Sequence, residues 1–197
     1  MTKGRLEAFS DGVLAIIITI MVLEIKVPHG TDWTALRPLL PVFLSYVLSF
    51  VYVGIYWNNH HLMLGSAHHI SGSVLWANSH LLFWLSLIPF STGWMGENNF
   101  APLPMAIYGF VLLMAALAYF LLKTTLIRAQ GPDSRLARAL GSDWKGKISP
   151  LLYALGIAAS FWHVEVAGLI YVAVALLWLV PDPRIGRSLA QEGTTEV

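Results

Sequence analysis

The chain contains no cysteine among its 197 residues, which excludes disulfides, thiolate metal sites and cysteine nucleophiles. Charge is scarce too: 12% of the residues are charged, against about 25% in ordinary soluble domains. The sequence also lacks a Walker phosphate-binding motif, a dinucleotide glycine motif and the H-E-x-x-H zinc motif. No paired catalytic carboxylates or nucleophile–base sets are evident, so we do not expect an enzyme.

What the chain has in abundance is apolar surface. Hydrophobic residues make up 56% of it, including eight Trp, seven Tyr and nine Phe. A soluble globule of this size could not bury so much apolar surface, so the excess must face lipid. The net charge of +1 gives no indication of nucleic-acid binding. The composition therefore predicts an all-α, polytopic membrane protein whose partner is membrane lipid.

Six apolar stretches are candidates for transmembrane helices, which gives a single transmembrane domain over residues 1–181 and a short tail over 182–197. The stretches are Phe9–Val27, Leu36–Trp57, Val74–Met95, Pro104–Ile127, Ile148–Trp162 and Val166–Val180. The last two are short and are separated by only three residues. One long fused helix is the alternative, and it would move the C-terminus across the membrane.

The distribution of Lys and Arg favours six spans. With the N-terminus inside, the inner segments hold ten of these residues and the outer loops hold only Lys26 and Arg37. Because cytoplasmic loops are enriched in Lys and Arg, we expect both termini to be cytoplasmic, in the cell membrane. The inner ten are Lys3, Arg5, Lys123, Arg128, Arg135, Arg138, Lys145, Lys147, Arg184 and Arg187.

The motif Arg5-x-x-x-Phe9-Ser10-Asp11 stands directly before the first apolar run. An Asp costs roughly 2.5–3.5 kcal/mol at the bilayer centre and less near its edges, so such a residue normally faces protein or water. Asp11 is therefore a candidate functional residue. The simpler alternative is that Ser10 and Asp11 only cap the start of a helix.

One stripe of this first helix carries Ile16, Thr19, Ile20 and Leu23, which lie within about 60° of Ile16 at 100° per residue. If several copies of the helix met around an axis, these side chains would form stacked aliphatic rings. Such rings gate by dewetting when narrow and pass a partly hydrated ion when wider. Every face of this helix is apolar, however, so the pattern alone does not distinguish a pore lining from a lipid-facing surface.

Histidine is the second unusual feature, since five of the seven lie in or beside the connection between the second and third stretches. Adjacent histidines on a helix point about 100° apart, so a metal site is not favoured over loop-anchoring hydrogen bonds. His80 lies one helical turn after Trp76, at the predicted depth of Ser10 and Asp11. We expect these side chains to meet in an inner polar cluster, because lipid cannot satisfy them. Asn78 is a weaker candidate, because it points about 200° away from Trp76.

These residues resemble the transmembrane-protein-175 potassium channels in their short bacterial form. The resemblance rests on Arg5-x-x-x-Phe9-Ser10-Asp11-Gly12-Val13, on Tyr56-Trp57-Asn58-Asn59-His60-His61, and on Trp76, Asn78 and Leu87-Ile88-Pro89-Phe90 in the third stretch. The likeness is close in the first half of the chain and extends to the second half only as hydropathy.

The resemblance implies a six-helix protomer and a homotetramer around a central pore lined by the first helix. Ile16 would form the principal constriction, Ile20 and Leu23 further rings, and Thr19 a polar lining position, with permeant potassium passing beside them. No structural metal and no other cofactor are implied. The inner network that fixes the pore helix would comprise Arg5, Phe9, Ser10, Asp11, Trp76 and His80.

The leading hypothesis is therefore a channel that prefers potassium weakly to moderately over sodium and admits other monovalent cations. It would work without a carbonyl filter, because the Thr-Val-Gly-Tyr-Gly sequence is absent. Two alternatives stay open. One is a proton-coupled membrane carrier that uses Asp11 and His80, since intramembrane carboxylates and histidines often relay protons. The other is a metal-dependent membrane protein or enzyme that uses the histidine-rich connection.

Overall fold

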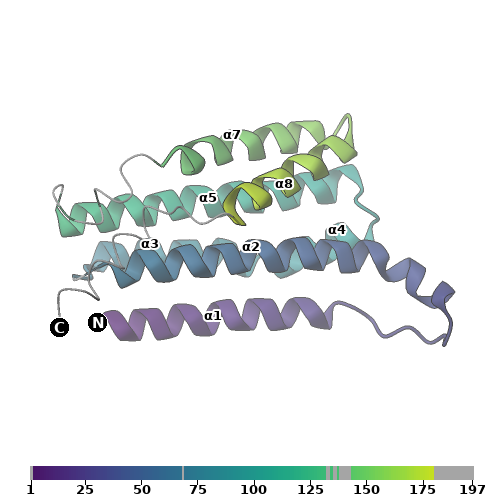
Figure 1. Ribbon diagram of the computed structural model, residues 1–197, viewed down its shortest axis with the longest axis horizontal. Helices are drawn as coiled ribbons and strands as arrows, with labels where there is room; N and C mark the ends of the chain where they lie inside the picture. The colour runs from purple at the N-terminus through teal and green to yellow at the C-terminus, as the bar shows by residue number, and fades with distance from the viewer. Residues whose placement is uncertain (1, 68, 132–133, 135–136, 138–142, 180–197) are drawn as a thin grey trace.

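The computed structural model describes residues 2–67, 69–131, 134, 137 and 143–179. Its regular elements are all helical (Figure 1). The first half holds α1 (Lys3–Leu23), a 3₁₀ segment η1 (Trp33–Leu39), α2 (Leu40–Gly65), α3 (Gly72–Ser86) and α4 (Ile88–Glu97). The second half holds α5 (Pro102–Gln130), α7 (Trp144–Ala159) and α8 (Val164–Leu179). The predicted tail over 182–197 lies outside the described residues.

The helices run side by side along the long axis, with α1 at one edge of the array and α7 at the other (Figure 1). Helix α1 packs against α2, α3 and α4, and α5 packs against α3, α4, α7 and α8. Hydrogen bonds at the helix ends hold one end of the molecule together: Lys3 Nζ donates to the Gly65 carbonyl at 2.5 Å, and Gln130 Nε2 donates to the His69 carbonyl at 2.7 Å. The start of α1 and the ends of α2 and α5 therefore lie together.

Within the described residues each predicted span lies largely in helix, although the first helix ends at Leu23 and the third span is interrupted. The third span is divided at Leu87, where α3 ends and α4 begins. Pro89 has no N–H to continue the ladder and its ring disfavours a preceding helical turn, which explains the break. In the part of the chain that the structure describes, four helical segments are long and apolar enough to cross a membrane, namely residues 3–23, 33–65, 72–97 and 102–130.

The last two predicted spans are separate helices. Helix α7 ends at Ala159, residues 160–163 turn the chain, and α8 packs back against α7 (Figure 1). The fused-helix alternative is therefore wrong. At 1.5 Å per residue, these two 16-residue helices are about 24 Å long, shorter than the roughly 30 Å of hydrocarbon.

Small residues bring α5, α7 and α8 close together. A Cβ built on Gly109 would lie 2.0 Å from the hydroxyl of Tyr171, and one on Gly156 would lie 2.4 Å from its ring. The buried Tyr171 ring occupies this space, and its hydroxyl donates to the Met105 carbonyl at 3.3 Å. Membrane helices commonly use glycine for such close approach. This packing joins the three helices into one support, which contacts α2 mainly through α8.

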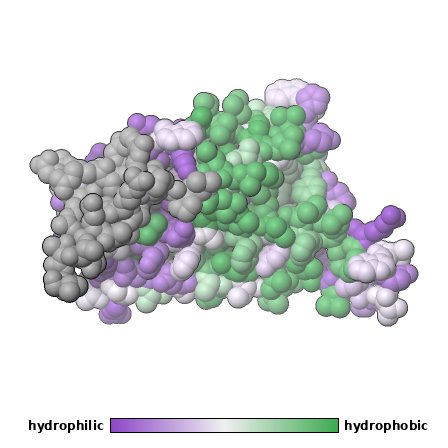
Figure 2. Space-filling view, viewed as in Figure 1, coloured by the Kyte–Doolittle hydropathy of each residue, from purple (hydrophilic) through white to green (hydrophobic). Residues whose placement is uncertain are grey.

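Apolar side chains gather over the middle of the molecule, and polar ones gather at its two ends (Figure 2). At the end remote from Lys3, Lys26 donates to Glu97 at 2.8 Å. That hydrogen bond and the charge of Glu97 raise the pKa of Lys26 above its usual value. A wide apolar band between polar ends is the arrangement expected of a protein that crosses a bilayer.

Candidate functional site

Helix α1 is covered by its own chain on one face only. Its buried residues are Leu6, Ser10, Leu14, Ile17 and Met21. The opposite stripe is uncovered: the exposed fractions are 57% at Ile16, 42% at Ile20 and 78% at Leu23, against 1% at Leu14. Phe9, at 55% exposed, continues the uncovered face toward the start of the helix. The structure thus shows that the predicted stripe and the packing face are different faces of α1. The sequence could not show this, because the helix is apolar on every side.

Thr19 is the polar member of this stripe. Its hydroxyl donates within the helix, with the Ala15 and Ile16 carbonyls at 3.1 and 3.0 Å. Because the hydroxyl hydrogen is used there, the remaining lone pairs of Oγ1 are free to accept or to contact a cation. An uncovered apolar surface with one oxygen acceptor can face either lipid or a narrow aqueous path.

A buried chain of hydrogen bonds ties α1 to α2 and α3. Asn78 Nδ2 donates to Ser10 Oγ at 2.9 Å, and Ser10 Oγ donates to the Leu6 carbonyl at 2.9 Å. The Asn78 Oδ1 atom lies 2.7 Å from Nε2 of His60, so the amide oxygen accepts from a protonated Nε2. Exposed fractions of 0% for Ser10 and Asn78 and 2% for His60 show that water does not compete. This polar cluster sets the rotation of α1 about its own axis.

Asp11 has a different partner from its neighbour Ser10. The indole Nε1 of Trp57 donates to Asp11 Oδ1 at 3.0 Å, which links α1 to α2 a second time. The Trp57 ring stacks on His61, with the two centroids 6.0 Å apart. Arg5 is exposed, and none of the ion pairs among the described residues includes Arg5 or Asp11. Within one chain, Ser10 and Asp11 of the motif are therefore hydrogen-bonded to α3 and α2, respectively.

Within a single chain, Trp76 and His80 do not meet the other residues of the expected inner network. Within a single chain Trp76 is 80% exposed, and His80 Nε2 accepts from Trp84 Nε1 at 3.0 Å instead of meeting Asp11. Asn78, the weaker candidate, is the residue of α3 that meets α1. The reason is the rotation of α3: it turns Asn78 inward, so the face about 200° away is left uncovered. Contacts of Trp76 and His80 with another copy stay a prediction.

The sequence did not predict that two residues of the site, His60 and Trp57, take part in its hydrogen bonds. Trp57 contributed only to the family resemblance, and His60 contributed to it and to the histidine-rich connection, where it was assigned no partner. Polar side chains at the end of an apolar run were a usable signal, because lipid does not satisfy them. Within the described part of the chain, no group of three His, Asp or Glu residues is placed to hold a metal ion.

Replacing Asn78 with leucine tests the buried cluster. The change keeps a similar volume but leaves the His60 N–H without its acceptor and Ser10 without its donor. We expect the free energy of unfolding to fall by about 1–3 kcal/mol, seen as a lower melting temperature of the purified protein in detergent. Asn58→Leu, on the exposed face of α2, is the matched control and should change little. Equal melting temperatures for the two variants would contradict the proposed role of the cluster.

Comparison with known proteins places this geometry in context. The family model for the endosomal/lysosomal potassium channel TMEM175 matches residues 5–89, which contain the motif and the polar cluster. A protein of Chryseobacterium sp. strain P1-3, named a potassium channel, is 56% identical over 191 residues, covering 97% of this chain and 100% of that protein. A human protein named the endosomal/lysosomal proton channel TMEM175 is 41% identical over 73 residues, covering 31% of this chain and 14% of that protein.

A solved structure agrees with the fold. The crystal structure of a lysosomal potassium-selective channel TMEM175 homologue from Chamaesiphon minutus superposes with a TM-score of 0.80 at 28% identity. The match covers 90% of this chain and 96% of that chain, so it extends well beyond residues 5–89. The second half of the chain, which resembled known proteins only by hydropathy, therefore shares the arrangement of its helices with that protein.

Proposed function

The chain belongs to the TMEM175 family of potassium channels, and from this premise we propose that it forms a homotetrameric potassium channel in the cell membrane. The uncovered stripe of α1 lines the conduction path, and both termini are cytoplasmic. Potassium is favoured weakly to moderately over sodium. The names of the bacterial relative and of the solved homologue support potassium as the permeant ion.

The single observation that carries this proposal is the uncovered aliphatic stripe opposite the packed face of α1. Four copies of α1 around an axis would place four Ile16 side chains in one ring, with Ile20 and Leu23 forming further rings. An aliphatic ring offers an ion no ligands, so passage requires that part of the hydration shell stays on. Selectivity then depends on ring width, which explains a preference weaker than that of carbonyl filters.

The polar cluster has a positioning role in this proposal. Because Asn78 holds Ser10 on the buried face, Ile16, about 120° away on the helical wheel, points out of the protomer. Thr19 lies on the same uncovered side and presents an oxygen between the aliphatic rings. A hydroxyl oxygen at this position would contact a partly dehydrated cation. Rotation of α1 would remove the rings from the axis.

The proposed activity is tested by ion flux from liposomes that contain the purified chain. We expect potassium-driven flux that exceeds sodium flux by a modest factor, with caesium also compared. Protein-free liposomes give the baseline. Liposomes whose flux equals that baseline for all three cations would overturn the assignment of a channel.

Asp11→Ala tests the second link between α1 and α2. The change leaves the Trp57 indole N–H without its acceptor, at the edge of the uncovered face where copies would meet. We expect a smaller tetramer fraction on size-exclusion chromatography in detergent. Asp11→Asn keeps an acceptor oxygen and should retain more tetramer. Identical elution of both variants and the original protein would show that Asp11 does not contribute to tetramer assembly.

Proton transport is the second candidate, because the human relative is named a proton channel and Asp11 stands near the end of a span. A carrier using Asp11 and His80 has less support, since His80 is engaged by Trp84 and Asp11 by Trp57 within the described chain. A pH gradient across the same liposomes separates the two functions. Saturable proton-coupled flux without single-channel steps would favour the carrier.

A further inference from the structure

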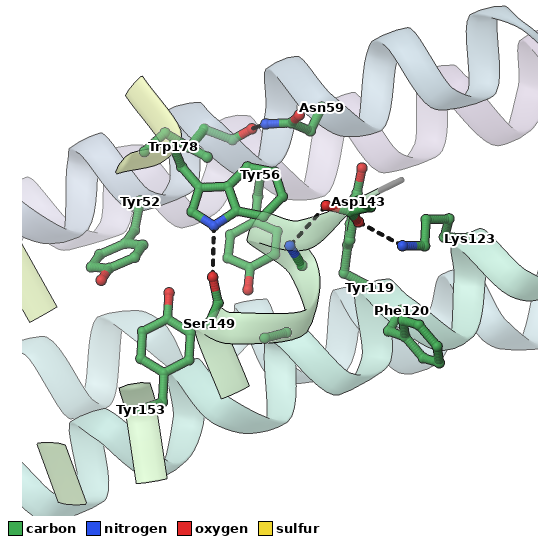
Figure 3. A pocket seen from close by; sticks show the side chains of 13 residues that line it. Tyr52, Tyr56, Asn59, Tyr119, Phe120, Lys123, Asp143, Ser149, Tyr153 and Trp178 are labelled. Atoms are coloured by element: carbon green, nitrogen blue, oxygen red, sulfur yellow. Dashed lines mark hydrogen bonds and ion pairs between the residues drawn. The ribbon is translucent and has the colours of Figure 1, made fainter. Parts of the chain in front are cut away.

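A small cavity lies inside the protomer, between α2, α5, α7 and α8 (Figure 3). Its volume is about 40 Å³, measured as the space open to the centre of a water-sized sphere. No residue of α1 lines it, so it is separate from the stripe discussed above. The lining residues are Tyr52, Ile55, Tyr56, Asn59, Ala116, Tyr119, Phe120, Lys123, Asp143, Gly146, Ser149, Tyr153 and Trp178.

Aromatic rings form much of the wall. The Tyr56 and Tyr119 rings meet edge to face with centroids 6.1 Å apart, and Tyr119 meets Trp178 in the same way at 6.5 Å. Ala116 of α5 is the smallest side chain in this wall. Rings held in this way favour an apolar ligand body, and they come from three different helices, α2, α5 and α8.

The charges at the cavity are already matched. Lys123 Nζ lies 2.5 Å from Asp143 Oδ2 and 5.0 Å from the centroid of the Phe120 ring. The second carboxylate oxygen of Asp143 accepts from the Gly146 backbone N–H at 2.8 Å, at the start of α7. An ion entering here would meet no unbalanced charge, so the cavity suits a neutral molecule.

Two hydroxyl groups in the wall have no hydrogen-bond partner among the described residues. They belong to Tyr56 and Tyr119, each only 8% exposed. The neighbouring polar groups are engaged: Trp178 Nε1 donates to Ser149 Oγ at 2.9 Å, and Asn59 Nδ2 donates to the Ile55 carbonyl at 2.8 Å (Figure 3). Among the described residues no side-chain nitrogen or oxygen is both fully buried and without a partner, so these two hydroxyls reach open space at the cavity. There each can donate to or accept from a small polar ligand.

We propose that this cavity binds a small neutral alcohol, with its hydroxyl hydrogen-bonded to Tyr56 and Tyr119 and its carbon chain against the aromatic wall. One water needs about 10–15 Å³ of such space, so the cavity takes about three waters or an alcohol of three to four non-hydrogen atoms. Ethanol and 1-propanol have this size. A ligand bound between α2 and the other three helices would change how α2 packs. Because α1 packs against α2, this change would reach the helix proposed to line the conduction path.

A series of straight-chain alcohols tests the site through flux. The effect on potassium flux should rise from methanol to 1-propanol and then stop rising, because longer chains do not fit. Ala116→Leu fills the cavity and should remove the effect of 1-propanol. Ala154→Leu, on the exposed face of α7, is the matched control and should keep it. An effect that grows steadily to 1-octanol, equally in all three proteins, would be bilayer partitioning and would overturn the proposal.

A structural measurement tests the same site without relying on conduction. Crystals soaked in 2-bromoethanol, which has four non-hydrogen atoms, should show an anomalous bromine peak between Ala116 and Trp178. The peak should be absent in Ala116→Leu. The double variant Tyr56→Phe/Tyr119→Phe keeps the volume but should weaken the binding of 2-bromoethanol about three- to tenfold, measured from peak height over a concentration series. Water density alone, or an adventitious additive only at the outer surface, would overturn the proposal.

Discussion

Replacing Ile16 with asparagine is expected to raise potassium conductance several-fold and to reduce the preference for potassium over sodium. The amide supplies a donor and an acceptor at the proposed principal ring, so water enters and an ion passes with its hydration shell intact. Ile16 is 57% exposed on its own chain, so the change leaves no buried polar group in the protomer. Single-channel recording in planar bilayers measures both quantities.

Val22→Asn is the matched control for this experiment. Val22 is 46% exposed on the same helix but points about 120° away from Ile16. It carries a similar aliphatic side chain, so the two substitutions have comparable cost on insertion into lipid. The control should keep the original conductance and ion preference. Equal currents from both variants would show that the Ile16 side of α1 does not face the conduction path.

The second large effect is expected from Asp143→Asn, which removes the counter-charge of Lys123. The Lys123 side chain is 6% exposed and the Asp143 side chain 15%, so the lysine would be left charged and without its partner. Breaking a buried pair in this way costs about 3–5 kcal/mol. Asparagine is a good helix N-cap, so the hydrogen bond from the Gly146 N–H can persist. Thermal unfolding in detergent measures the loss.

A second substitution separates the charge effect from other damage. Lys123→Met in the Asp143→Asn background removes the unpaired charge and retains a long apolar side chain. Because apolar replacement of a buried pair is often close to neutral, stability should recover to within about 1–2 kcal/mol of the original protein. A double variant as unstable as Asp143→Asn would show that the carboxylate acts through something other than its charge on Lys123.

Hydropathy predicted the helices well because their length and composition are set by the bilayer. The predicted span from Leu36 to Trp57 corresponds to η1 and α2, and the span from Pro104 to Ile127 lies inside α5. The break at Leu87 was not predicted, although Pro89 was visible in the sequence. Hydropathy does not detect a missing backbone N–H, because the side chains on both sides of the break remain apolar.

The site was predicted only in part, for a different reason. Helical periodicity placed Ile16, Ile20 and Leu23 on one stripe, but it could not say which face packs, since all faces of α1 are apolar. The same ambiguity on α3 led to Trp76 and His80 being preferred over Asn78 as partners of α1. Packing decides the rotation of such helices. A sequence with little polar contrast does not carry that information.

The Lys123–Asp143 pair shows a further limit. Lys123 was counted only as one of ten inner cations, and Asp143 was not considered at all. They lie 20 positions apart, on α5 and at the start of α7, so no local spacing indicated their contact. Only the arrangement of the helices brings them together. Long-range pairs of this kind cannot be read from one sequence.

The most direct test is a density map of the assembled protein in lipid with potassium present. We expect four copies, with α1 of each surrounding the central axis and Ile16 directed toward it. Ser10 should face its own protomer and remain bonded to Asn78. A map in which α1 lies against lipid, with another helix surrounding the axis, would contradict the account.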